Sequence, residues 1–109
     1  MVEFSPMKTF RDYKDTSILL TEERRKHILE HPEMKGMLQH IKETLSAPQR
    51  VIQSISDKNA HLYYHFYIGT KVGDKYLCVV VKMVNKDAFV LTAYLTDSIK
   101  KGEIIWLRK

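Results

Sequence analysis

From Arg50 onward, strand-forming segments alternate with short polar turns, and this succession constrains the fold more than any other feature of the chain. The segments are rich in β-branched and aromatic residues, which favour strands. In chain order they read RVIQSIS, HLYYHFYI, YLCVVVKMV, AFVLTAYLT and EIIW. The turns between them are short, so the pattern predicts an antiparallel β-meander of four to five strands.

The preceding part of the chain has helical signals. Thr21 is a suitable N-cap, the glutamates after it suit a helix N-terminus, and Pro32 ends this first helix after about His31. Apolar residues with helical spacing predict a second helix over about 33–46. They are Met34, Met37, Leu38, Ile41 and Leu45. We expect residues 1–17 to be irregular apart from a short strand that begins at Ser17.

The predicted fold is therefore one α+β domain over residues 1–109, with a core over 18–106 and both helices packed on one face of the sheet.

Alternation of side chains in 61–68 predicts two different faces for this strand. The apolar face has Leu62, Tyr64, Phe66 and Ile68, and the more polar face has His61, Tyr63, His65 and Tyr67. Two hairpin registers keep the apolar faces together. They place Phe66 opposite Val79, Tyr63 opposite Lys82, Val79 opposite Ala93, and Val80 opposite Thr92.

The opposite face of this sheet is then polar and aromatic. Its members are His61, Tyr63, His65, Tyr67, Lys82, Thr92, Tyr94 and Thr96, around Cys78 and Val80. Such a face is either simply solvated or a binding surface. It has more aromatic and histidine residues than a solvated face usually carries, and Lys82 is suited to holding an anion.

The charge distribution points to polyanionic partners. The formal net charge is +5, and three of the excess positive charges lie after residue 97, where four cations accompany Glu103. They either form a solvated end or contact phosphates.

The sequence also bears on where the protein is found. No apolar run is long enough for a membrane span, and the N-terminus lacks a signal-peptide core. Cys78 is the only cysteine, so we expect a cytoplasmic protein without an internal disulfide.

A histidine pair is the most conspicuous chemical motif. His27 and His31 are spaced i, i+4 with Glu30 between them, a spacing compatible with a shared metal. Pro32 breaks the helix directly after the pair, which argues against the zinc-protease pattern that the string matches literally. His31 is also suited to a helix C-terminus, and either histidine to proton transfer. Because acidic residues do not cluster, phosphodiester chemistry here would use His, Lys, Arg, Thr and Tyr, which suits RNA with its 2′-OH nucleophile.

Four strings in order resemble the phage-associated branch of the barnase–EndoU–colicin–RelE nuclease superfamily. They are ILLTEERRKHILEHPEM, LYYHFYI, VVVKMV and FVLTAYLTDSIKKGEIIW, spanning about residues 18–106. The resemblance implies a metal-independent endoribonuclease with no cofactor, often a toxin or mobile-element effector, for which a neutralising protein partner is a further expectation. It implies catalytic roles for residues matched by position. These are His27, His31 with Glu33, Lys82, Thr92, Tyr94 and Thr96.

Two main hypotheses follow. In the first, the polar face binds RNA, Lys82 neutralises the phosphate, and His27 or His31 transfers protons. Further substrate contacts would come from Tyr63, His65, Lys100 and Lys101. In the second, the same fold is a non-catalytic module for nucleic acid or protein, with Tyr63, Tyr67 and Tyr94 as stacking surfaces. A weaker third hypothesis is a metal enzyme that uses the histidine pair.

Overall fold

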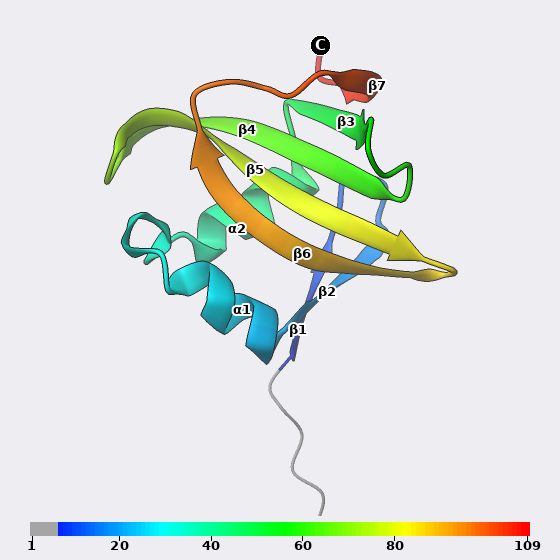
Figure 1. Cartoon of the computed structure of the whole chain (residues 1–109), viewed down its shortest axis with the longest axis horizontal. Helices are drawn as coiled ribbons and strands as arrows, with labels where there is room; N and C mark the ends of the chain where they lie inside the picture. The colour runs from blue at the N-terminus through cyan, green and yellow to red at the C-terminus, as the bar shows by residue number, and fades with distance from the viewer. Residues whose placement is uncertain (1–6) are drawn as a thin grey trace, which may run out of the picture.

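The computed structural model describes residues 7–109, which form one strongly curved sheet and two α-helices (Figure 1). In chain order the elements are β1 (Met7–Arg11), β2 (Ser17–Thr21), α1 (Glu22–Leu29), a 3₁₀ turn (Pro32–Met34), α2 (Leu38–Ser46), β3 (Arg50–Ser54), β4 (Ala60–Thr70), β5 (Gly73–Val84), β6 (Asp87–Thr96) and β7 (Gly102–Leu107). The strand order is β1-β2-β6-β5-β4-β3-β7.

The predicted meander of four to five antiparallel strands is wrong. The described sheet has seven strands, and β2 pairs with β6 in parallel, through Leu19 and Phe89. Residues 7–11, expected to be irregular, form β1 against β2, while residues 1–6 lie outside the described part. A parallel partner far along the chain has no local turn between its strands, so the sequence carries no hairpin signal for this pairing.

The second helix begins later than predicted. Thr21 caps α1 as expected by accepting a hydrogen bond from the Arg24 backbone N–H. After Pro32 the chain makes only a 3₁₀ turn, because Lys35 is extended and Gly36 has a φ of +78°, a conformation that favours glycine. The helix α2 therefore starts at Leu38.

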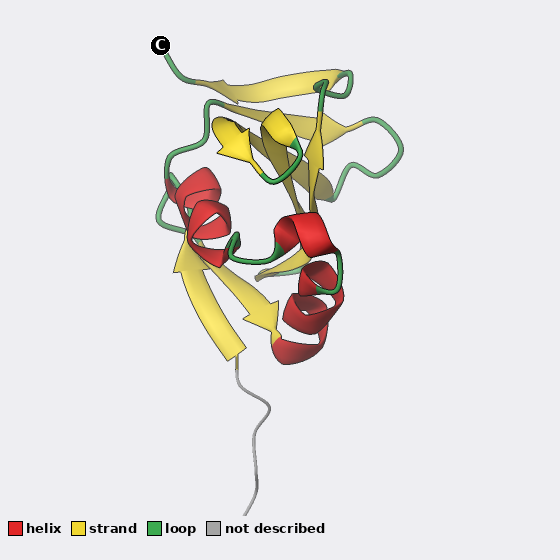
Figure 2. Cartoon of the chain, turned by 90° about the vertical axis from the view of Figure 1, so that its left-hand side faces the viewer, coloured by secondary structure: helices red, strands yellow, loops and turns green. Residues whose placement is uncertain are grey.

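Both helices lie on the same side of the sheet and cover its main core (Figure 2). Ile28 of α1 and Ile41 and Leu45 of α2 are at most 1% exposed and pack against Leu77, Val79 and other strand residues. A second, smaller core lies on the opposite side, called the far face here. It contains Ile52, Ala60, Leu62, Tyr64, Cys78 and Val80.

The predicted faces of β4 are reversed. Tyr63 lies opposite Val79 instead of Lys82, so Tyr63 and Tyr67 point toward the helices while Leu62 and Tyr64 point to the far face. Both faces of this strand carry large apolar or aromatic residues and both are buried, so alternation alone did not distinguish them.

The predicted register between β5 and β6 is confirmed. Val79 pairs with Ala93 and Val80 with Thr92. A bulge just beyond Val80 then shifts the register, so that Val90 enters the main core and Leu91 packs on the far face. Bulges of this kind re-aim side chains without ending the strand pairing.

Candidate functional site

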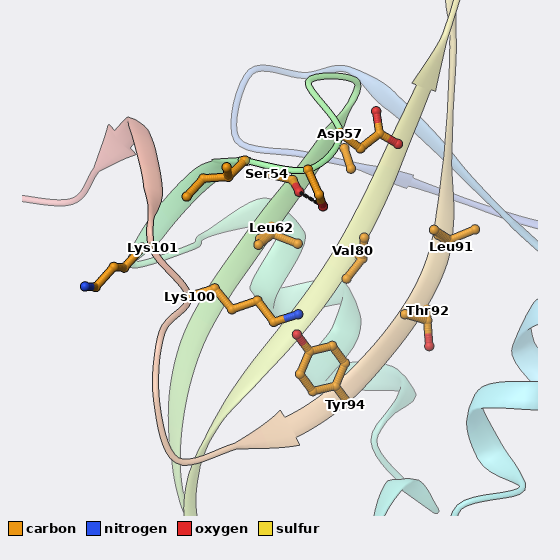
Figure 3. A pocket seen from close by; sticks show the side chains of 12 residues that line it. Ser54, Asp57, Leu62, Val80, Leu91, Thr92, Tyr94, Lys100 and Lys101 are labelled. Atoms are coloured by element: carbon orange, nitrogen blue, oxygen red, sulfur yellow. Dashed lines mark hydrogen bonds between the residues drawn. The ribbon is translucent and has the colours of Figure 1, made fainter.

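A groove of about 410 Å³ lies on the far face of the described part of the chain (Figure 3). Its apolar floor consists of Ala60, Leu62, Val80 and Leu91 from β4, β5 and β6. The remaining lining residues are Ser54, Ile55, Ser56 and Asp57 after β3, Thr92 and Tyr94 of β6, and Lys100 and Lys101 before β7. An apolar floor with a few polar groups at its rim is typical of ligand sites.

The topology explains one wall of this groove. Because β7 lies beyond β3 at the edge of the sheet, the chain that leaves β6 has to pass β5, β4 and β3 before it can form β7. This connection, residues 97–101, crosses the far face, where Ile99 packs on the smaller core. The Lys100 backbone N–H donates to the Tyr64 hydroxyl at 3.1 Å, which fixes the connection over β4.

Lys100 supplies the positive charge of the groove. Its ammonium lies 5.9 Å from the centre of the Tyr94 ring, within the range of a cation–π contact. Figure 3 shows the Lys100 side chain extending across the groove toward Tyr94, whereas Lys101 points outward. The groove therefore has one ammonium directed inward above an apolar floor, and a second one at its rim.

Lys82 does not act as a lone cation. Its ammonium forms an ion pair with Asp57, and both side chains are about one-third exposed, at 29% and 35%. The hydrogen bond from Lys82, aided by one from the Asn59 backbone N–H, lowers the pKa of Asp57. The predicted role of Lys82 as the phosphate-neutralising residue therefore competes with this ion pair.

Three groups stay protonated at neutral pH, one from Tyr94 in the groove lining and two from Cys78 and Tyr64 in the smaller core. Burial raises the pKa of the Cys78 thiol and of the Tyr64 and Tyr94 hydroxyls. The Tyr94 hydroxyl oxygen is shielded from solvent, and no hydrogen bond to it of ordinary geometry is present among the described residues. Tyr94 is thus suited to donating a hydrogen bond and unsuited to acting as a base.

The structure separates His27 and His31 from the groove. Both are exposed on or just after α1, with ring centres 6.3 Å apart, and His27 Nδ1 lies 3.9 Å from Glu30 Oε1. Since α1 packs through Ile28 on the helix side of the sheet, this pair lies across the sheet from Thr92 and Tyr94. Glu33 belongs to the 3₁₀ turn on that side too.

Three other predicted site residues also lie away from the groove or are already engaged. Tyr63 is 1% exposed in the main core. His65 stacks on Tyr67, on the helix side, with ring centres 4.5 Å apart. Thr96 ends β6, where its hydroxyl bonds to the backbone of Ser98. Of the predicted residues, the groove brings together Thr92, Tyr94, Lys100 and Lys101.

Sequence reasoning missed a second cluster on the helix side, called the histidine–tyrosine cluster here. It consists of His40, Glu43, His65 and Tyr67. The Tyr67 hydroxyl donates to Glu43 Oε1 at 2.7 Å, and the His40 ring meets the Tyr67 ring edge-on at 4.5 Å. A usable signal was present, because His40 and Glu43 lie one turn apart on the predicted helix. Sequence reasoning placed Val80 of the groove floor on the site face but missed Leu62, because β4 was assigned the wrong face, and Leu91, because the bulge in the pairing of β5 with β6 was not foreseen. It also missed Asp57, which lies before β4.

A metal centre finds no support in residues 7–109, where His, Cys, Asp and Glu never gather in threes with a geometry that would hold an ion. Within the same residues, neither helix has the length and apolar character that crossing a membrane requires.

No protein-family model matches the chain, and no curated protein or solved structure matches it. The chemistry of the groove therefore has to be inferred from its own residues.

Proposed function

We propose that this chain is an RNA-binding domain that seats one nucleotide of single-stranded RNA in the far-face groove. The observation that carries the proposal is the Lys100 ammonium held above the Tyr94 ring, at the mouth of an apolar floor. The resemblance to barnase–EndoU–colicin–RelE nucleases supports the same class of ligand.

Each part of a nucleotide has a counterpart in the groove. The base packs on Leu62, Val80 and Leu91, which offer apolar surface on three adjacent strands. The phosphate pairs with Lys100, whose backbone is already fixed by Tyr64, so little ordering is needed on binding. The rim hydroxyls of Ser54, Ser56 and Thr92 are available to the ribose, including its 2′-OH.

The electrostatics favour an anion over a cation in this groove. Among residues 7–109, Asp57 is the only acidic residue that lines it, and its charge is offset by Lys82. The net charge of the groove is therefore positive, because Lys100 and Lys101 have no further acidic residue in the described lining to offset them. A phosphate contact made by such lysines releases counterions and weakens steeply as salt is added.

Fluorescence anisotropy with a labelled single-stranded RNA, measured over a series of salt concentrations, tests the proposal. Lys100→Ala should weaken binding about tenfold and reduce the slope of log K against log salt by about 0.7. Lys71→Ala, an exposed lysine in the turn between β4 and β5, is the matched control and should bind like the wild type. Unchanged binding by Lys100→Ala, or equal affinity for DNA of the same sequence, would contradict the proposal.

A second candidate function is endoribonuclease, and the histidine–tyrosine cluster favours it. His65 Nδ1 lies 2.9 Å from the Phe66 carbonyl, which can only accept, so this nitrogen carries the proton and Nε2 is left as a base. His40 and His65 both contact Tyr67, so two imidazoles lie within reach of one nucleotide. One can take the 2′-OH proton while O2′ attacks phosphorus, and the other can protonate the departing 5′ oxygen.

An assay of the cleavage of labelled RNA distinguishes the RNA-binding domain from the endoribonuclease. Circular dichroism confirms that each protein used in the assay is folded. If the cluster is catalytic, His40→Ala and His65→Ala should each abolish cleavage. If the exposed pair is catalytic as the sequence resemblance implies, His27→Ala and His31→Ala should do so instead. RNA that is bound and left intact by the wild type supports the binding domain and excludes both catalytic assignments.

A further inference from the structure

The outer edge of β7 is the most apolar exposed edge of the described sheet. β7 ends the strand order, so one of its edges has no partner strand among residues 7–109. Four consecutive apolar residues on it are exposed: Ile104 at 50%, Ile105 at 38%, Trp106 at 40% and Leu107 at 49%. Exposed apolar edge strands are templates for pairing with another strand, and proteins normally block them with charges or cover them.

The opposite edge of the sheet shows such blocking. β1 reads MKTFR, and its Lys8 and Arg11 are exposed. Charged side chains on an edge strand disfavour the approach of a second strand. The two edges therefore differ, and only β7 combines an unpaired backbone with an apolar surface.

We propose that β7 pairs with β7 of a second copy of this chain, antiparallel and about a two-fold axis, so that the sheet continues from one protomer to the other. The charges at the two ends of the strand select this arrangement. Glu103 lies at its start and Arg108 directly after its end, and both are exposed. An antiparallel partner brings Glu103 of each copy opposite Arg108 of the other, whereas a parallel partner would place like charges together.

The apolar residues agree with this register. With Glu103 opposite Arg108, Ile104 lies opposite Leu107 and Ile105 opposite Trp106. Within one chain Ile104 pairs with Ile52, a far-face residue, and Leu107 pairs with Arg50, two residues earlier on the same strand. Ile104 and Leu107 therefore share the far face, and across the two-fold axis they would meet each other.

A charge swap tests both the partner and the register. Sedimentation equilibrium of the wild type should give a mass that rises with concentration from 12.8 kDa toward twice that value. Glu103→Arg should weaken association about tenfold or more, since it places two arginines opposite each other. The double variant with Glu103→Arg and Arg108→Glu should restore it, because the pairs are then reversed on both sides.

Lys8→Glu on β1 is the matched control and should leave the mass unchanged. Because the Arg108 guanidinium also bonds to the Ala47 carbonyl, thermal melting of each variant shows whether the monomer fold is retained. A wild type that stays monomeric at all concentrations would overturn the proposal. So would a dimer that the charge reversal at Glu103 leaves unchanged, or a double variant that does not regain association, since either result requires a different surface.

Discussion

The Tyr63 hydroxyl donates a hydrogen bond of 2.7 Å to the Asp12 carboxylate, which joins the middle of β4 to the turn after β1. Asp12 is 5% exposed and also accepts hydrogen bonds from the backbone N–H groups of Lys14 and Thr16. One buried carboxylate thus shapes the turn between β1 and β2 and fastens it to the main sheet.

Tyr63→Phe removes the side-chain donor to this buried carboxylate and leaves its charge less well compensated. We expect the free energy of unfolding to fall by about 1–3 kcal/mol, as for other buried hydrogen bonds to charged groups. Urea denaturation measures it. Tyr76→Phe, on the far face, is the control and should change stability much less. Equal stability of Tyr63→Phe and the wild type would contradict the role given to this contact.

The ion pair between Lys82 and Asp57 predicts a pH dependence. Hydrogen bonding lowers the pKa of Asp57 below its ordinary value of 3.8. The stabilisation from this pair is therefore complete above that value and is lost as the pH falls through the lower, folded-state pKa. In Lys82→Met, carboxyl NMR titration should show the Asp57 pKa rising toward 3.8. The same pKa in both proteins would show that Lys82 does not hold this carboxylate.

The Cys78 thiol should react slowly in the folded protein. It is 0% exposed in the middle of β5, and burial raises its pKa, so both access and thiolate population are reduced. Ellman's reagent at mildly alkaline pH should modify it at least about tenfold faster in urea than in native buffer, where modification requires local unfolding. Equal rates in the two conditions would mean that the smaller core opens readily.

Gly102 should tolerate no side chain. A Cβ added there would collide with the Gln53 carbonyl and the Ile52 side chain, where β7 joins β3. At Gly69, with φ of +75° and open space around it, Ala meets only conformational strain of about 1–2 kcal/mol. We therefore expect Gly102→Ala to destabilise more than Gly69→Ala. Hydrogen exchange should locate the loss in β7, and equal exchange protection of β7 in both variants would contradict the collision.

The sequence predicted those elements whose signals are local. Thr21 caps the first helix as expected, although the helix ends at Leu29 and not at about His31, and the pairing of Val79 with Ala93 followed from alternation across a short turn. The register of β4 could not be obtained in the same way. Tyr63 has a hydroxyl that suits a polar face, yet it is buried because Asp12, distant in the sequence, accepts its hydrogen bond.

The candidate site was predictable only in part. Thr92 and Tyr94 share a face by strand alternation, so the sequence already placed them together. The approach of Lys100 to Tyr94 depends on the path of the connection after β6, and that path is set by the position of β7 beyond β3. No local pattern encodes such a strand order.

The curvature of the sheet has a consequence for how the chain folds. Tyr13, just after β1, stacks on Trp106 of β7 with ring centres 4.8 Å apart, so the turn after one edge strand contacts the strand at the opposite end of the sheet order. Together with the pairing of Leu19 and Phe89, this contact closes loops that contain most of the described chain. Contacts of such long sequence separation slow the search for the native state. On the ribosome, the hairpin of β1 and β2 would have to wait for β6 and then for Trp106 before it can join the rest of the sheet.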